Sequence, residues 1–187
     1  MNDHKIKIEK ANSSLLMFGI FSVVMLFAGL TSAYIVSKGS LGSSWDNIIL
    51  PSAFYISTTL IVISSFSASL SISYCKKNNL LMLNRLLLIT ILLGFSFAIC
   101  QFFGWRELVD MGKYLSGNNV SSSYLYILTI VHLVHIIGGL AALLYVYIRS
   151  LSNIYNSSSF HGIKLAMRFW HFLGLLWIYL VFFISFL

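Results

Sequence analysis

The stretch Tyr124–Ile148 reads YLYILTIVHLVHIIGGLAALLYVYI, and it decides how the rest of the chain is interpreted. As a helix it would be roughly 36 Å long at about 1.5 Å per residue, enough to cross the ~30 Å hydrocarbon core of a bilayer. His132 and His135 are three residues apart and so share one face, which Gly138 continues, with Gly139 beside it. Polar and small residues along one stripe predict a helix that packs tightly against a neighbour.

The composition of the chain is that of a membrane protein. It has 187 residues, of which 58% are hydrophobic and 9% are charged, and its mean hydropathy is +0.88. Soluble proteins carry about 25% charged residues. With one proline and twelve glycines, the chain has little sequence suited to flexible linkers. We therefore predict a single all-α membrane domain over residues 1–187.

Five apolar runs are long enough to cross a bilayer as helices, which takes about 20 residues each. They are residues 13–36, 48–74, 86–105, 124–148 and 169–187. Helices satisfy their own backbone hydrogen bonds in lipid, and the chain lacks the alternation of apolar and polar residues typical of a membrane β-barrel. The pattern predicts a bundle of five transmembrane helices.

The lysines and arginines are distributed unevenly between the loops. Nine of the twelve fall before the first span, between the second and third, or between the fourth and fifth. The remaining three, Lys38, Arg106 and Lys113, lie on the opposite side. The positive-inside rule then predicts a cytoplasmic N-terminus and an outer C-terminus. The net charge of +7 is accounted for by topology, and without a basic soluble face no nucleic-acid partner is expected.

The second span is rich in serine. Ser65, Ser69 and Ser73 are four residues apart, which predicts a ridge of small residues for close approach of another helix. A hydrophilic conduit is the alternative interpretation, but no ionisable residue accompanies these serines.

The histidines raise the question of haem ligation, because imidazoles inside membrane bundles commonly serve as axial ligands. His135 lies roughly 20 Å from the cytoplasmic end of its span, whereas His171 lies within the first turn of the last span. His132 and His135 cannot both bind one iron from the same helix. Neither has a carboxylate or thiol within one turn, which disfavours zinc. Interhelical hydrogen bonding is the preferred interpretation, and a stand-alone haem-binding membrane cytochrome or anchor remains an alternative.

A set of short motifs, in this order and spacing, resembles cytochrome c oxidase subunit III. The motifs are Leu50-Pro51 with Ser64-Ser65, Gly94 with Gln101 and Trp105, Thr129 with His132, His135 and Gly138-Gly139, and Trp170-His171-Phe172 with Trp177. The resemblance runs from Leu15 to Leu187. It is to the short bacterial form with five helices.

The resemblance implies a subunit without redox centres in a haem–copper terminal oxidase of an aerobic respiratory chain, in the bacterial inner membrane. Such a subunit packs on the catalytic subunit I, which holds the haems and a copper, and it supports proton uptake and protects the active site. It belongs to a proton-translocating oxidoreductase but has no catalytic centre of its own. Subunit II, subunit IV and a larger respiratory supercomplex are further candidate partners. The same subunit in a quinol oxidase is the close alternative.

The resemblance also indicates which residues matter. Packing and family-motif roles are expected for Gln101, Trp105, His132, His135, Gly138, Gly139, Trp170, His171 and Trp177. Phospholipid is the only ligand expected for this chain, and the candidate lipid-binding residues are His132, His135, Arg168, Trp170 and His171.

Three positions depart from the family pattern. Where the family carries acidic residues, this chain has Val23 in the first span, Gly104 after the glutamine of the third span, and Gly174 after Trp-His-Phe. Roles that depend on those carboxylates are therefore not expected to carry over, whereas the scaffold and lipid roles do not depend on them.

Overall fold

The computed structural model describes residues 2–42, 45, 49–116, 119–152 and 160–186. They form five α-helices, which are α1 (Asn2–Leu41), α2 (Ser52–Lys76), α3 (Leu80–Asp110), α4 (Val120–Leu151) and α5 (His161–Phe186). Each helix is long and apolar enough to cross a membrane. The chain is thus an all-helical, multi-pass membrane protein with five candidate spans, as the apolar runs predict.

The helices extend beyond the predicted apolar runs at most of their ends. The backbone hydrogen bonds of a helix do not stop at the lipid boundary, so polar residues at the interface continue the same helix. The largest difference for the site is at α5, which begins at His161 although its apolar run begins at 169. His171 is therefore about 15 Å from the start of its helix and not in its first turn.

A short turn joins α2 to α3, the pair of helices with the most extensive contact in the described structure. Asn78 has a positive φ of 57°, a conformation that asparagine tolerates better than most residues. Asn79 then caps α3, because its side chain accepts a hydrogen bond from the Met82 amide at 3.1 Å. Two residues with turn chemistry thus join two antiparallel helices.

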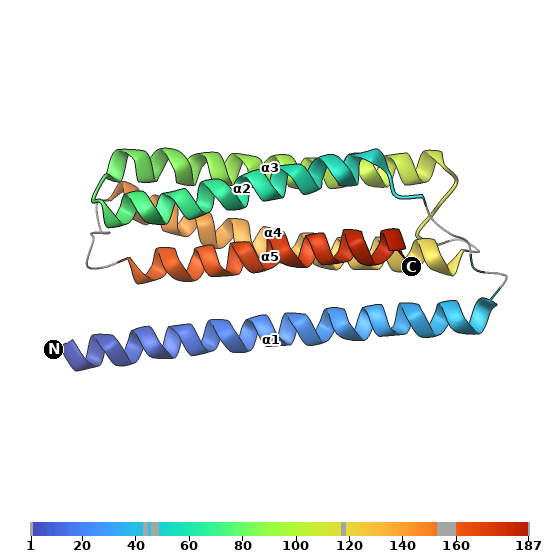
Figure 1. Ribbon diagram of the computed structural model, residues 1–187, viewed down its shortest axis with the longest axis horizontal. Coiled ribbons are helices and arrows are strands. Elements are labelled where there is room, and N and C mark those ends of the chain that lie inside the picture. Colours follow the sequence, from blue (N-terminus) through green and yellow to red (C-terminus); the bar gives the residue numbers. More distant parts are fainter. Residues whose placement is uncertain (1, 43–44, 46–48, 117–118, 153–159, 187) are drawn as a thin grey trace.

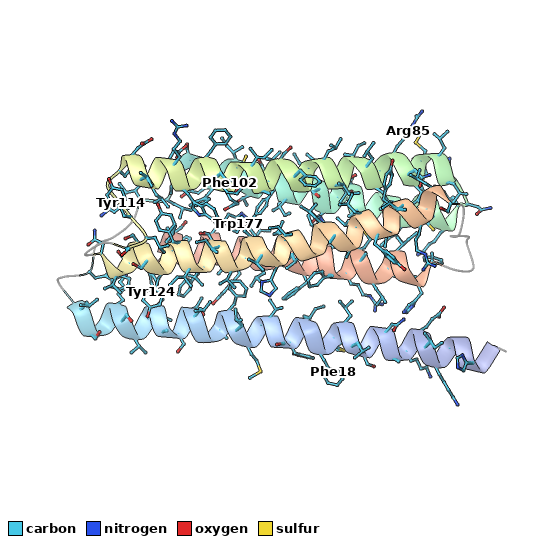
Figure 2. The ribbon with its side chains drawn as sticks, turned by 180° about the vertical axis from the view of Figure 1, so that it is seen from behind. Phe18, Arg85, Phe102, Tyr114, Tyr124 and Trp177 are labelled. Atoms are coloured by element: carbon cyan, nitrogen blue, oxygen red, sulfur yellow. The ribbon has the colours of Figure 1, made fainter. Side chains whose placement is uncertain are left out.

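The five helices form three layers, with α2 and α3 in one, α4 and α5 in the next and α1 in the last (Figure 1). Contacts connect α2 with α3 and α5, and α4 with α3 and α5, so these four helices make a closed bundle. Helix α1 lies outside this bundle against α4 and α5. Only 11% of the most apolar window of α1 is buried, against 33–44% in the other helices. Phe18, for example, points away from the rest of the chain (Figure 2).

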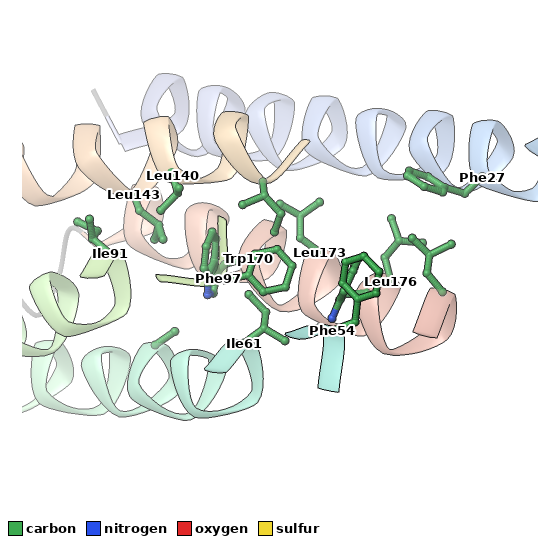
Figure 3. Packing of buried hydrophobic residues seen from close by; sticks show 14 of the residues in the cluster. Phe27, Phe54, Ile61, Ile91, Phe97, Leu140, Leu143, Trp170, Leu173 and Leu176 are labelled. Carbon is green, nitrogen blue, oxygen red and sulfur yellow. The ribbon is translucent and has the colours of Figure 1, made fainter. Parts of the chain in front are cut away.

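The core of the bundle is aromatic. Trp177 of α5 contacts Phe54 of α2 and Phe97 of α3, with ring centroids 5.7 and 5.1 Å apart, both in edge-to-face geometry. Trp170 lies about two turns nearer to the start of α5, near Leu140 and Leu173 (Figure 3). Aromatic pairs in this geometry add to the stability gained from burial alone.

The predicted serine ridge of α2 meets α5 in part, through Ser65 near Gly174 and Ser69 near His171. Ser69 and Ser73 are exposed, and the serines that face α3 are offset from the predicted set. Ser64 donates to the Thr90 carbonyl at 3.3 Å and Ser67 donates to the Leu86 carbonyl at 3.2 Å. A shift of one residue rotates the stripe by about 100°. Serines thus occupy two stripes of α2, one facing α3 and the other reaching α5. Composition alone could not show which helix each stripe contacts.

Candidate functional site

His132 lies at the centre of the bundle and is completely buried. Its ring stacks on Trp177, with centroids 5.2 Å apart and planes inclined by 29°. Phe97 and Phe27 approach edge-to-face at 6.1 and 6.2 Å. Within the described part of the chain, neither ring nitrogen has a hydrogen-bond partner. His132 thus makes aromatic contacts in the described structure, whereas the sequence analysis expected a hydrogen bond between helices.

Gln101 of α3 is the second buried polar residue in this region, with 1% of its surface exposed. Both of its amide atoms also lack a partner among the described residues. Trp105, one turn further along α3, donates its indole N–H to Thr129 Oγ1 at 3.0 Å. Phe97, one turn back, contacts His132. Gln101 therefore lies between these two α3–α4 contacts, at the level of His132.

Trp105 links α3 and α4 in two ways. Besides its bond to Thr129, its backbone carbonyl accepts from Tyr126 OH at 3.3 Å. Tyr126 OH also lies 3.0 Å from the Lys113 carbonyl. These contacts tie the end of α3 and the segment after it to the first turns of α4.

Two tryptophans of α5 make the matching links to α2. Trp170 donates its indole N–H to Ser64 Oγ at 2.9 Å, and Trp177 donates to Thr58 Oγ1 at 3.1 Å. The tryptophans are seven residues apart on α5 and the hydroxyls six residues apart on the antiparallel α2, so both pairs are separated by about two turns. Thr58 was missed by the sequence analysis. The signal that could have found it is the similar spacing of indole donors and hydroxyl acceptors.

The glycine pair of α4 behaves differently at its two positions. A Cβ at Gly139 would lie 2.8 Å from Leu173 Cδ1 and 3.2 Å from Trp170 Cε3. Gly94 of α3 is equally close, with a Cβ falling 2.7 Å from Trp170 Cη2. Trp170 therefore fits between two glycines on different helices. A Cβ at Gly138 meets no atom within 4 Å in the described structure, so Gly138 makes no close helix contact within this part of the chain, and its packing role stays a prediction. The contact face of α4 lies one residue further round the helix.

His135 and His171 are half-buried and lie on different sides of the chain. His135 Nδ1 donates to the Val131 carbonyl of its own helix at 2.7 Å, and its ring contacts Phe27 of α1. His171 Nε2 lies 3.2 Å from Ser69 Oγ of α2. Among the described residues, no three His, Cys, Asp or Glu side chains are grouped so that they could hold a metal ion.

A groove of about 380 Å³ runs between α2 and α5. It is lined by Ile61, Val62, Ser65, Ser69, His171, Gly174, Leu175 and Ile178. Gly174 forms part of its floor, since a Cβ there would lie 3.1 Å from Ser65 Oγ. The groove is thus apolar along most of its length, with a polar group of Ser69 and His171 at one end.

Two of the residues predicted to bind lipid are not on the surface of the described structure. His132 and Trp170 are both 0% exposed, so neither side chain is placed to touch lipid. Arg168 is exposed and its guanidinium lies 3.5 Å from Ser13 Oγ of α1. His135 and His171 keep partial exposure.

The structure shows which residues surround the three positions at which the family carries acidic residues. A Cβ at Gly104 would lie 2.6 Å from Phe54 Cε1, so the Phe54 ring occupies the space that a larger side chain would need. Val23 packs against the apolar core from α1, and Gly174 lies at the floor of the groove. The surroundings of Gly104 and Val23 are apolar and packed, whereas Gly174 borders the groove beside the Ser65 hydroxyl.

The fold and these contacts define a multi-pass membrane protein in which the indoles of three tryptophans join helix to helix. The family model for cytochrome c oxidase subunit III matches residues 1–187. The chain belongs to the cytochrome c oxidase subunit III family, and it is a subunit of a haem–copper oxidase.

The curated relatives include subunits of cytochrome c oxidases and a subunit of a ubiquinol oxidase. A probable cytochrome c oxidase subunit 3 of Nocardia farcinica is 29% identical, over 84% of this chain and 78% of the relative. A cytochrome bo(3) ubiquinol oxidase subunit 3 of Buchnera aphidicola is 30% identical, over 97% of this chain and 95% of the relative. The cytochrome c oxidase subunit 3 of Spodoptera frugiperda is 28% identical, over 67% of this chain and 82% of the relative.

Proposed function

We propose that this chain is the non-redox subunit III of a cytochrome c oxidase, in which it packs on the catalytic subunit I and protects the active site during turnover. The observation that carries the proposal is that tryptophan side chains form hydrogen bonds between helices. The indoles of Trp105, Trp170 and Trp177 each donate to a hydroxyl on another helix. This is the chemistry of a rigid scaffold, and it agrees with the family to which the chain belongs.

Subunit I is the main partner in this proposal, and it holds the haems and copper. Subunit II, subunit IV and a larger respiratory supercomplex are further partners. The surfaces available to them are the apolar outer faces of the helices. The N-terminus lies in the cytoplasm and the C-terminus on the outer side of a bacterial inner membrane, as the positive residues favour.

Phospholipid is the proposed ligand, and the groove between α2 and α5 is the proposed place for an acyl chain. Arg168, His171, Leu175 and Ile178 follow one another at intervals of three or four residues, so they form one stripe along α5. Arg168 lies about one turn nearer to the start of α5 than His171, where a guanidinium can bind a lipid phosphate. His171 then lies beside the glycerol region and the groove receives the chain. His135, on the side of α1, is proposed as a separate lipid contact.

The function is tested by purifying the oxidase with and without this chain. We expect haem content per subunit I to stay the same, initial oxygen reduction to remain measurable, and activity to decay faster during sustained turnover when the chain is missing. Loss of haem absorption in proportion to loss of the chain would instead support the haem-ligating alternative. Decay at an unchanged rate would contradict the protective role.

A quinol oxidase is the second candidate, because the Buchnera relative matches more of both chains than the Nocardia one. The two candidates differ in the electron donor of the partner subunits. Oxygen consumption by the purified complex with reduced cytochrome c, and separately with a quinol, distinguishes them. Activity with quinol alone would replace the cytochrome c proposal and leave the scaffold role unchanged.

A further inference from the structure

The polar pair of Gln101 and His132 is the most concentrated group of unpartnered polar atoms in the described structure. All four of its side-chain polar atoms, Gln101 Oε1 and Nε2 and His132 Nδ1 and Nε2, are buried and without a hydrogen-bond partner there. The other buried atoms of this kind are single ones, Ser121 Oγ and His161 Nε2, at the first turns of their helices. Buried polar groups are normally hydrogen-bonded, and the penalty for leaving them unpaired is largest where no water can enter from lipid.

The register of α3 and α4 places the two residues at the same level of the bundle. Ser150 at the end of α4 donates to Asn84 near the start of α3, and Trp105 donates to Thr129 near the other end. In antiparallel helices each step forward on α3 corresponds to a step back on α4. Gln101 is therefore level with residue 133, next to His132.

The rings that enclose His132 offer no free hydrogen-bond donor among the described residues. His132 is enclosed by the rings of Phe27, Phe97 and Trp177. The one donor among these rings, the Trp177 indole N–H, is already used by Thr58. A partner from lipid or from another subunit cannot reach side chains that are 1% and 0% exposed.

A direct bond between the two side chains would leave part of the group unsatisfied. A neutral imidazole has one donor and one acceptor nitrogen, and a primary amide has two N–H donors and one carbonyl acceptor. One bond between them uses one atom of each residue, so two of the four polar atoms would remain unpaired. A water molecule makes about three hydrogen bonds at a typical buried site, so one water can bond to both amide atoms of Gln101 and to one nitrogen of His132. Three of the four polar atoms are then paired, one more than in the direct contact.

We propose that one water molecule is bound between Gln101 of α3 and His132 of α4, at the centre of the bundle. It bonds to the amide and to the imidazole, and so joins α3 to α4 midway between the Trp105–Thr129 and Asn84–Ser150 contacts. No Asp, Glu, Lys or Arg lies in the middle of any span, so the water serves as a neutral structural bridge and not as a step in a charged relay.

The direct test is a structure of the whole oxidase at a resolution that shows ordered water. We expect a density peak at hydrogen-bond distance, about 2.7–3.2 Å, from both side chains. An amide in direct contact with the imidazole, or side chains turned to other partners with no peak between them, would overturn the proposal. This test uses the wild-type complex and does not depend on a variant that folds.

An infrared measurement gives a second, independent readout. The O–H stretching bands of a buried water shift when the sample is exchanged into H₂¹⁸O, and we expect one such band to be lost in Gln101→Leu and in His132→Phe. Ser96→Ala, on the exposed face of α3, is the matched control and should retain the band. A band that persists in both variants of the polar pair would place the water elsewhere and refute the assignment.

Discussion

The two adjacent glycines of α4 give the sharpest test of the packing described above. Gly139→Leu and Gly138→Leu introduce the same side chain one residue apart on the same helix. At Gly139 the first added carbon would lie 2.8 Å from Leu173 Cδ1, whereas at Gly138 it would meet no atom within 4 Å in the described structure. The two variants thus differ mainly in the direction in which the added side chain points from the helix.

The magnitude follows from that distance. Carbon atoms in contact are normally about 3.5–4.0 Å apart, so the Cβ at Gly139 overlaps Leu173 by about 0.7 Å or more before the rest of the leucine is added. Leu173 and Trp170 are both fully buried and have little room to move. Overpacking of this kind costs about 1–3 kcal/mol, a factor of about 5 to 150 in the folding equilibrium. At Gly138, loss of a helical glycine should instead be neutral or stabilising by up to about 1 kcal/mol.

The assay is the amount of chain in membranes and the thermal midpoint of the purified oxidase, compared for wild type and both variants. We expect Gly139→Leu to lower both quantities and Gly138→Leu to leave the amount of chain unchanged. A Gly138→Leu variant with normal chain levels but poor recovery with subunit I would locate a partner surface at that glycine. Equal loss of chain for both variants would refute the assigned contact face of α4.

Three further predictions follow from the same structure. Trp177→Phe removes an indole N–H donated to α2 and should lower stability by about 0.6–1.7 kcal/mol, measured as a fall in the thermal midpoint without loss of haem. Reporter fusions after Lys77 and after Gly42 should report the cytoplasm and the outer side respectively, and a reversed result would contradict the charge-based orientation. His132→Gln combined with His135→Gln should leave the haem spectrum of the complex unchanged while weakening assembly modestly; a loss of haem absorption would revive the ligand interpretation.

The helices could be predicted from sequence because lipid imposes a simple requirement on length and hydropathy. All five apolar runs became helices, and the family was identified from motifs that the family model also matches. The helix ends could not be predicted, since polar interface residues continue a helix with no change in backbone bonding. His161 and residues after it, for example, belong to α5 although they precede the apolar run.

The directions of side chains were the harder part, because a one-residue error rotates a face by about 100°. Gly138 and Gly139 are identical in composition and adjacent, yet one faces open space and the other contacts Leu173. On α2, serines occupy both the exposed and the buried stripe. Where a large residue marks the face, as Trp170 does, the prediction of a packing role agrees with its full burial.

The missing carboxylate at Gly104 is accommodated by a neighbouring aromatic residue and not by an empty space. The Phe54 ring lies where any side chain at that position would begin, and it also packs edge-to-face on Trp177. Trp177 in turn stacks on His132, so the ring that fills this space is continuous with the rings around the polar pair. Introducing a carboxylate by Gly104→Glu alone would therefore displace Phe54 and bury a charge without a partner. A carboxylate-dependent role at this position would need compensating changes on α2, whereas the tryptophan–hydroxyl links that hold the scaffold need none.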